Sequence, residues 1–126
     1  MTVVDEIGRS SYISLTTYRK DGTGVATPVW HALDGGDLVI ISDADAWKVK
    51  RIRNNPHVVV TVCNVRGKIA PGAPSAEGTA RILDDAGTQN GRALVARKYV
   101  MSRLGNWLTT VLRLRRRPVI GIAVTL

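Results

Sequence analysis

Six short runs rich in β-branched and other apolar residues occur along the chain, and turn-forming residues separate them. The runs lie at residues 12–18, 25–33, 38–42, 57–65, 77–83 and 119–126. Between the first two runs, Asp21-Gly22 is a strong signal for a hairpin turn. The segment 34–37, Asp-Gly-Gly-Asp, predicts a second tight turn. This spacing predicts six strands joined mostly by hairpins, as in a small antiparallel barrel.

Two residues interrupt predicted strands. Pro28 has no backbone N–H to donate, so its strand is expected at a sheet edge, at a bulge, or where the ladder lies open to a ligand. Gly78 suggests a β-bulge in the fifth strand. The density of apolar residues in 57–65 predicts burial on both faces or a dimer contact. The Pro/Gly-rich segment 66–75 predicts a loop that is either flexible or closes over a site.

A short helix is predicted between residues 42 and 56, where the third strand gives way to the fourth. Val49 and Ile52 are three positions apart, so they share one face and can pack inward. Asp43 and Asp45 are short hydrogen-bond acceptors, which predicts that they cap the N-terminus of this helix.

Four cations, Lys48, Lys50, Arg51 and Arg53, lie on this short helix. Cations beside the free N–H groups of a helix start favour a phosphate site. A solvated basic face explains the same pattern equally well.

The last third of the chain predicts two more helices, over 84–103 and 106–114. Arg113 and the three arginines at 115–117 then form a cationic end before Pro118. They suit either an anionic ligand or a solvated helix end.

The composition describes one strongly basic globular domain, spanning residues 1–126. A net charge of +8 favours nucleic acid, a membrane surface, or a phosphorylated or polyacidic small molecule as partner. With three Trp, three Tyr and no Phe, a stacking platform for single-stranded nucleic acid is disfavoured. No run has the length of a membrane span and no secretory signal is visible, so the expected location is the cytoplasm.

No set of side chains for acid–base, nucleophilic or metal chemistry stands out in the sequence. His31 and His57 lack another ligand type at metal spacing, so no metal site is predicted. His31 fits a satisfied strand histidine better than a general base. The aspartates at 34/37 and 84/85 are explained by turns and helix caps. An enzyme of this kind would depend on a cofactor for its chemistry.

The elements in this order resemble the flavin/deazaflavin oxidoreductase superfamily, the pyridoxamine-5'-phosphate-oxidase-like group with the split β-barrel fold. The resemblance runs through V-A-T-P-V-W-H at 25–31, D-L-V-I-I-S-D-A-D-A-W-K-V-K-R-I-R-N-N-P at 37–56 and E-G-T-A-R-I-L at 77–83. The branch it is most similar to is the coenzyme F-420-dependent enzymes of actinobacteria. The implied fold is mainly β, a six-stranded antiparallel split β-barrel with short flanking helices.

The resemblance also implies a cofactor site. The cofactor phosphate would lie at the start of the short helix on Lys48, with Lys50 and Arg51 as helpers. Trp47 stands where flavin-using oxidases of the superfamily often carry Arg, which favours a deazaflavin over FMN. The tricyclic ring would lie along the second and third strands, on Thr27, Pro28, Val29, Ile41 and Ser42.

The implied activity is hydride transfer from reduced coenzyme F-420, an 8-hydroxy-5-deazaflavin, to an unsaturated organic small molecule. The implied assembly is a homodimer with cofactor sites at the interface. Coenzyme F-420 carries a phosphodiester and a poly-γ-glutamate tail, so the helix cations and the Arg113 to Arg117 cluster are candidates to hold it. An FMN-dependent oxidase or reductase of the same fold and a basic nucleic-acid-binding module stay open as alternatives.

Overall fold

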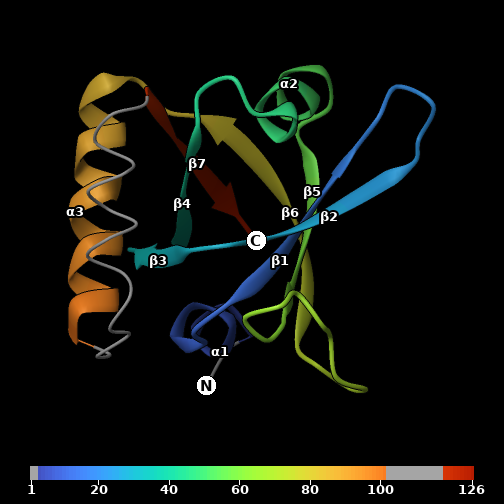
Figure 1. Ribbon diagram of the computed structural model, residues 1–126, viewed down its shortest axis with the longest axis horizontal. Coiled ribbons are helices and arrows are strands. Elements are labelled where there is room, and N and C mark those ends of the chain that lie inside the picture. Colours follow the sequence, from blue (N-terminus) through green and yellow to red (C-terminus); the bar gives the residue numbers. More distant parts are fainter. Residues whose placement is uncertain (1–2, 102–117) are drawn as a thin grey trace.

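The computed structural model describes residues 3–101 and 118–126, except the side chains of 99–101. Seven strands of the described residues form one antiparallel sheet that curls into a half-barrel (Figure 1). They are β1 (Ile13–Tyr18), β2 (Gly24–Val29), β3 (His31–Asp34), β4 (Asp37–Asp43), β5 (His57–Val62), β6 (Ser75–Ile82) and β7 (Val119–Thr125). The mainly β split-barrel prediction is confirmed.

The strand count differs from the predicted six because the 25–33 run forms two strands. The sheet order is β2-β1-β5-β6-β7-β4-β3, so β2 and β3 are its two edges. Trp30 alone separates these two strands in the chain. Two opposite edges joined by one residue can meet only if the sheet curls, and the apolar 25–33 run conceals this break.

Pro28 lies on the edge strand β2 and faces Ser14 of β1 in the ladder, which confirms its predicted edge position. The predicted bulge at Gly78 is wrong, because β5 and β6 pair in continuous register with Val58 opposite Gly78. A Cβ at Gly78 would lie 2.7 Å from the carbonyl oxygen of Thr125. Glycine therefore permits close packing there instead of a bulge.

The described residues contain three helices, α1 (Val3–Arg9), α2 (Trp47–Asn54) and α3 (Asp85–Met101). α1 has no predicted counterpart. Its Ile7 is completely buried in the core of the barrel. α3 begins as predicted, because the Asp84 carboxylate accepts the Gly87 N–H at 2.8 Å. The predicted 106–114 helix and the 113–117 arginines lie outside the described residues.

α3 covers the outer face of the sheet beside β3, β4 and β7 (Figure 1). A Cβ at Gly91 would lie 2.5 Å from Val39 Cγ1, so the helix lies very close to β4. On β7, Ile122 and Val124 point into the barrel core, while the Gly121 N–H donates to the Thr88 hydroxyl of α3. Both faces of β7 are therefore covered within one chain.

Among the described residues, none of the helices combines the length and the apolar character needed to cross a membrane.

Candidate functional site

The short helix α2 follows the end of β4, and its inward face holds it against the barrel. Val49 and Ile52 are both buried in the core, as their spacing predicted. The predicted caps are wrong: Ala46 occupies the N-cap position, and no described side chain caps the helix. The helix starts at Trp47, which leaves Asp43 and Asp45 before the cap position. The first N–H groups of α2 are thus not satisfied by a side-chain cap of the described chain.

A cavity of about 380 Å³ opens where the two sheet edges meet, and we call it the junction cavity. Five of the nine predicted site residues line it: Pro28, Val29, Ile41, Ser42 and Lys48. Because β2 ends at Val29 and β4 passes into α2 after Asp43, the cavity has an apolar strand wall and a polar end at the helix start.

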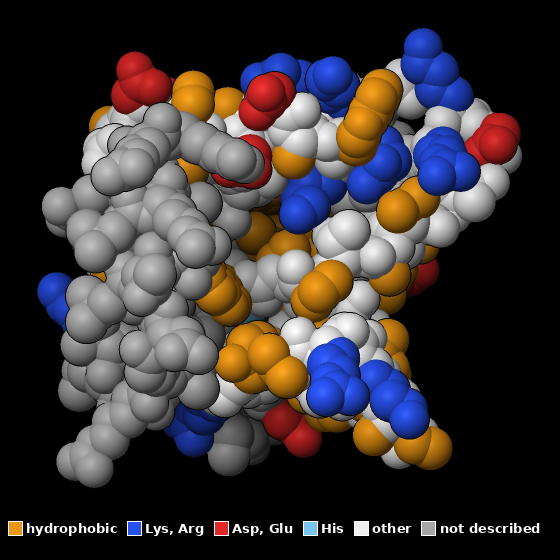
Figure 2. All heavy atoms as spheres, in the orientation of Figure 1, with side chains coloured by type: hydrophobic (Ala, Val, Ile, Leu, Met, Phe, Trp, Pro, Cys, Tyr) orange, Lys and Arg blue, Asp and Glu red, His pale blue; other side chains and the backbone are white. Residues whose placement is uncertain are grey.

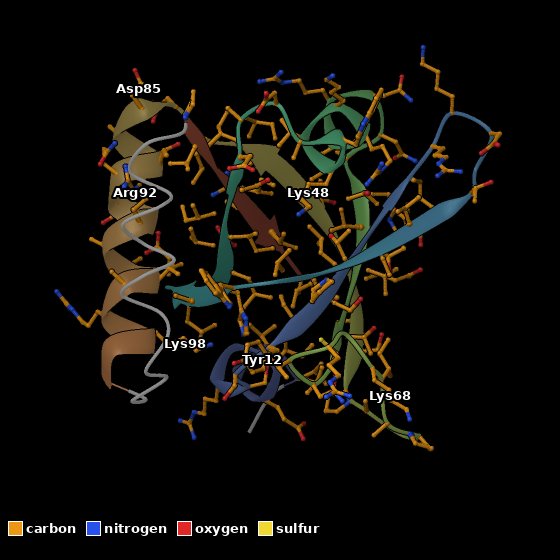
Figure 3. All side chains as sticks on the ribbon, in the orientation of Figure 1. Tyr12, Lys48, Lys68, Asp85, Arg92 and Lys98 are labelled. Atoms are coloured by element: carbon orange, nitrogen blue, oxygen red, sulfur yellow. The ribbon has the colours of Figure 1, made fainter. Side chains whose placement is uncertain are left out.

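Lys48 supplies the cation of the junction cavity. Figure 3 shows its side chain extending from α2 into the space between β4 and β2. Figure 2 shows a hollow on this face, with hydrophobic side chains inside and a cationic side chain above it. Burial, followed by the nearby charge of Arg51, lowers the pKa of Lys48, while the Asp43 carboxylate raises it. A half-buried ammonium attracts an anion more strongly than a fully solvated one.

Two hydroxyl groups flank the strand wall. The Ser42 hydroxyl donates to the Asp43 carbonyl oxygen at 3.1 Å. Thr27, the one predicted ring contact outside the junction cavity lining, precedes Pro28 on β2. Its buried Oγ1 has no hydrogen-bond partner within the described chain. A buried hydroxyl without a partner is costly, which is consistent with a polar ligand atom reaching this edge.

The other three predicted residues, Trp47, Lys50 and Arg51, line a separate cavity of about 460 Å³. We call it the hairpin cavity, because it lies between α2 and the tip of the β1–β2 hairpin. These residues and Asn54 occupy positions i, i+3, i+4 and i+7 of α2, hence one helix face. Lys48 is rotated away from that face. The structure therefore brings four of the five predicted strand residues together with Lys48 and places Trp47, Lys50 and Arg51 in the other cavity.

Several lining residues of both cavities were not predicted. Tyr12 and Val65 reach the junction cavity because β1 and β5 pair with Ile13 opposite Val62. No local pattern could have revealed this contact between segments fifty residues apart.

Three other lining residues of the junction cavity could have been found from the sequence, because Trp30, Asp43 and Ala46 are adjacent to predicted site residues. The hairpin cavity adds Tyr18, Arg19, Lys20 and Asn54.

His31 lies on β3 and is completely buried. Its Nε2 is 2.9 Å from the Ile7 carbonyl oxygen and 3.1 Å from Lys98 Nζ. Burial, followed by the charge of Lys98, lowers the pKa of His31 to about 4. His31 is therefore a buried strand histidine that is hydrogen-bonded through Nε2, as predicted. No three His, Cys, Asp or Glu side chains gather to hold a metal ion among the residues that the structure describes.

The family described as Pyridoxamine 5'-phosphate oxidase matches residues 2–125. An F420 reductase has a similar structure, with 19% identity, a TM-score of 0.59, and 99% of this chain and 94% of that chain covered. A FAD-binding protein from Mesorhizobium loti shares 14% identity at a TM-score of 0.63, covering 98% and 86% of the two chains. HutZ, the heme storage protein from Vibrio cholerae, has 13% sequence identity and a TM-score of 0.65, and the match covers 99% of this chain and 90% of that chain. No curated protein sequence matches the chain.

Proposed function

The chain belongs to the pyridoxamine 5'-phosphate oxidase family, and from this premise we propose that it is an oxidoreductase whose junction cavity binds a flavin-type cofactor. One observation carries the proposal. The half-buried cation Lys48 shares one cavity with the apolar strand residues Pro28, Val29 and Ile41. This pairing suits a ligand that joins a flat apolar ring to an anionic phosphate.

The donor set of the cavity fits such a cofactor. Lys48 would hold the phosphate by a charge-assisted hydrogen bond at the start of α2. Pro28 and Val29 would orient the ring at the edge strand β2, whose outer side pairs with no other described strand. Trp30 and Ile41 would exclude water from the ring. When bound in reduced form, the cofactor supplies a hydride for an unsaturated organic substrate, and the chain contributes binding and orientation.

We further propose coenzyme F-420 as the cofactor. Trp47 occupies the position where flavin-using relatives often carry Arg, and its side chain faces the hairpin cavity instead of the junction cavity. The positive charge of the chain suits the acidic tail of the deazaflavin. The F420 reductase with a similar structure supports this choice. FMN is the alternative, supported by the structural similarity to a FAD-binding protein.

We also propose a homodimer in which the partner chain completes the junction cavity. The loop between β5 and β6 exposes two large apolar side chains, Val65 at 63% and Ile69 at 46%. Val65 also lines the junction cavity. Large exposed apolar side chains on a loop that reaches the cavity favour a contact with another chain.

The test is to titrate cofactor-free protein with coenzyme F-420 and, separately, with FMN. We expect F-420 to bind more tightly. Lys48→Ala should weaken its binding by about 1 to 3 kcal/mol, since a charged hydrogen bond to the phosphate is lost.

The control is Arg97→Ala, which removes one exposed positive charge from α3, outside the lining of the junction cavity. It should leave affinity unchanged. Equal affinity of the Lys48→Ala variant and the unmodified chain would remove Lys48 from the site. A melting temperature that falls in step with affinity would give Lys48 a structural role instead. Failure of both cofactors to bind would overturn the proposed function.

A further inference from the structure

We propose that the hairpin cavity is a second, separate ligand site that takes a small phosphorylated aromatic molecule of the nucleotide class. Among the described residues, it shares no lining residue with the junction cavity. The proposal is therefore independent of the proposed cofactor site.

Four of the seven residues that line the hairpin cavity are cations: Arg19, Lys20, Lys50 and Arg51. No carboxylate of the described chain lines it. The neighbouring carboxylate, Asp21, accepts the Thr23 N–H at 2.9 Å and is thus engaged in the hairpin turn. Four like charges around one cavity repel one another, and a bound anion would relieve that repulsion.

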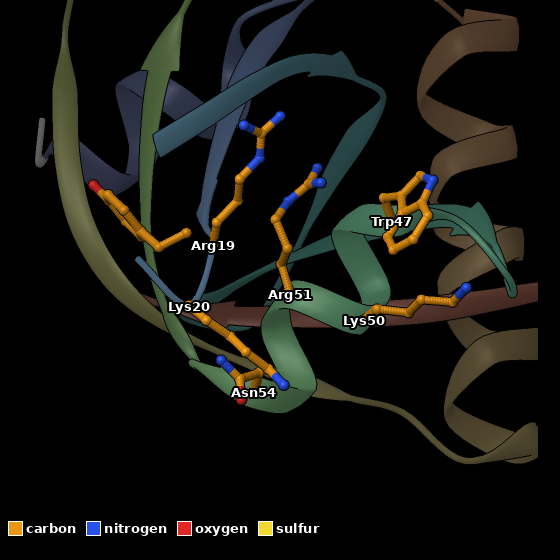
Figure 4. Close-up of a pocket in the computed structure, with 7 residues that line it drawn as sticks. Arg19, Lys20, Trp47, Lys50, Arg51 and Asn54 are labelled. Carbon is orange, nitrogen blue, oxygen red and sulfur yellow. The ribbon is translucent and has the colours of Figure 1, made fainter. Parts of the chain in front are cut away.

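The two arginines are arranged to act together. Figure 4 shows Arg19 and Arg51 side by side, with their guanidinium groups pointing the same way. Burial, followed by the charge of Arg19, lowers the pKa of Arg51. Arg51 Nε donates to the buried Thr17 hydroxyl at 2.6 Å. This bond orients the guanidinium and leaves its terminal N–H groups for a phosphate, which they can bind in a bidentate manner.

An aromatic platform completes the cavity. Trp47 is 70% exposed although it is among the largest apolar side chains of the fold. Lys50 Nζ lies 4.4 Å from the centre of its ring, which fixes the indole by a cation–π contact. A planar base can stack on an exposed indole held in place in this way. Figure 4 also shows Lys20 extending toward Asn54, whose amide can both donate and accept.

The size of the cavity agrees with this ligand class. Its volume of about 460 Å³ lies within the range of small-molecule pockets, which runs from roughly 300 to 1,000 Å³. A diphosphate on the arginines and a base on Trp47 would use both the charged and the aromatic parts of the lining.

The experiment is calorimetric titration of the cofactor-free full chain with ADP and with inorganic pyrophosphate. ADP should bind more tightly than pyrophosphate. Arg19→Gln/Arg51→Gln should lower the affinity for both probes by about tenfold or more, from lost charge-assisted hydrogen bonds. Trp47→Ala should lower the affinity for ADP alone. If the double variant fails to fold, Arg19→Gln on the exposed hairpin tests the same claim.

The matched control is Arg66→Gln/Arg97→Gln, which removes two exposed arginines away from the cavity. It should lose much less affinity than the Arg19/Arg51 pair, and an equal loss would overturn the site in favour of nonspecific charge attraction. Absence of ADP binding would overturn it directly. Pyrophosphate bound as tightly as ADP would refute the proposed stacking of the base on Trp47. A loss of ADP binding in Lys48→Ala, or displacement of ADP by long-tailed coenzyme F-420, would assign the anion to the cofactor site and refute a separate ligand.

Discussion

Acid should lower the stability of the fold where α1, β3 and α3 pack together, because protonating His31 places a second positive charge beside Lys98. His31 Nε2 lies 3.1 Å from Lys98 Nζ in a buried site. Lys98 Nζ also donates to the carbonyl oxygens of Gly8 at 2.9 Å and Ser10 at 2.7 Å, at the end of α1. Burial and the charge of Lys98 both disfavour the protonated imidazole, and they outweigh the Ile7 carbonyl oxygen, which favours it.

The pKa of His31 sets the size and the sign of the effect. Its value is about 4 in the fold, against an ordinary 6.5. Between these values the unfolded chain binds a proton that the folded chain does not. The contribution of His31 to the free energy of unfolding is therefore fully present above pH 6.5 and is lost as the pH falls from 6.5 through 4. At about 1.4 kcal/mol per tenfold change in proton affinity, the full contribution is about 3 kcal/mol. About 2 kcal/mol of it should be lost by roughly pH 4.5.

Proton NMR can measure this pKa, because the chain has only two histidines. His57→Gln identifies the remaining ring signal as that of His31. Lys98→Met should raise the pKa of His31 by removing the neighbouring charge, but it should stay below 6.5 because the burial remains. Urea unfolding at pH 7 and pH 4.5 measures the stability, and His31→Gln should lose about 2 kcal/mol less over that interval than the unmodified chain.

Titration of His31 near 6.5 would refute the buried, cation-paired environment. A pKa unchanged by Lys98→Met would show that burial alone is responsible. Equal acid sensitivity of His31→Gln and the unmodified chain would assign the loss of stability to other groups.

Gly78→Ala should destabilise the fold by about 1 to 3 kcal/mol, because its Cβ would collide with the Thr125 carbonyl oxygen; an unchanged urea midpoint would show that β6 and β7 can separate. Sedimentation should find a dimer at micromolar concentration, and a monomer would contradict the homodimer. Replacing Arg115, Arg116 and Arg117 with Gln should weaken the binding of long-tailed coenzyme F-420 more than the binding of a tailless phosphate form. This difference in affinity should shrink at high salt. Equal losses for both forms would mean that the arginines do not contact the tail.

The sequence alone determined the elements whose patterns are local. Alternating apolar residues and the Asp21-Gly22 turn defined the first hairpin, and proline chemistry limited Pro28 to an edge, a bulge or an open ladder. The spacing of Val49 and Ile52 identified the inward face of α2. These features depend on backbone geometry within a few residues, so their side chains carry the signal directly.

Only the tertiary structure decided how these elements meet. The break at Trp30 follows from strand order, which makes β2 and β3 opposite edges that the curled sheet brings together. The division of Lys48 from Trp47 and Arg51 depends on which side of α2 faces each strand. Burial of Ile7 holds α1 in place, although seven residues make a marginal helix by themselves. Strand pairing and burial bring together segments that are distant in the sequence. The free energy that favours these contacts depends on residues of both segments, so no local pattern reveals it.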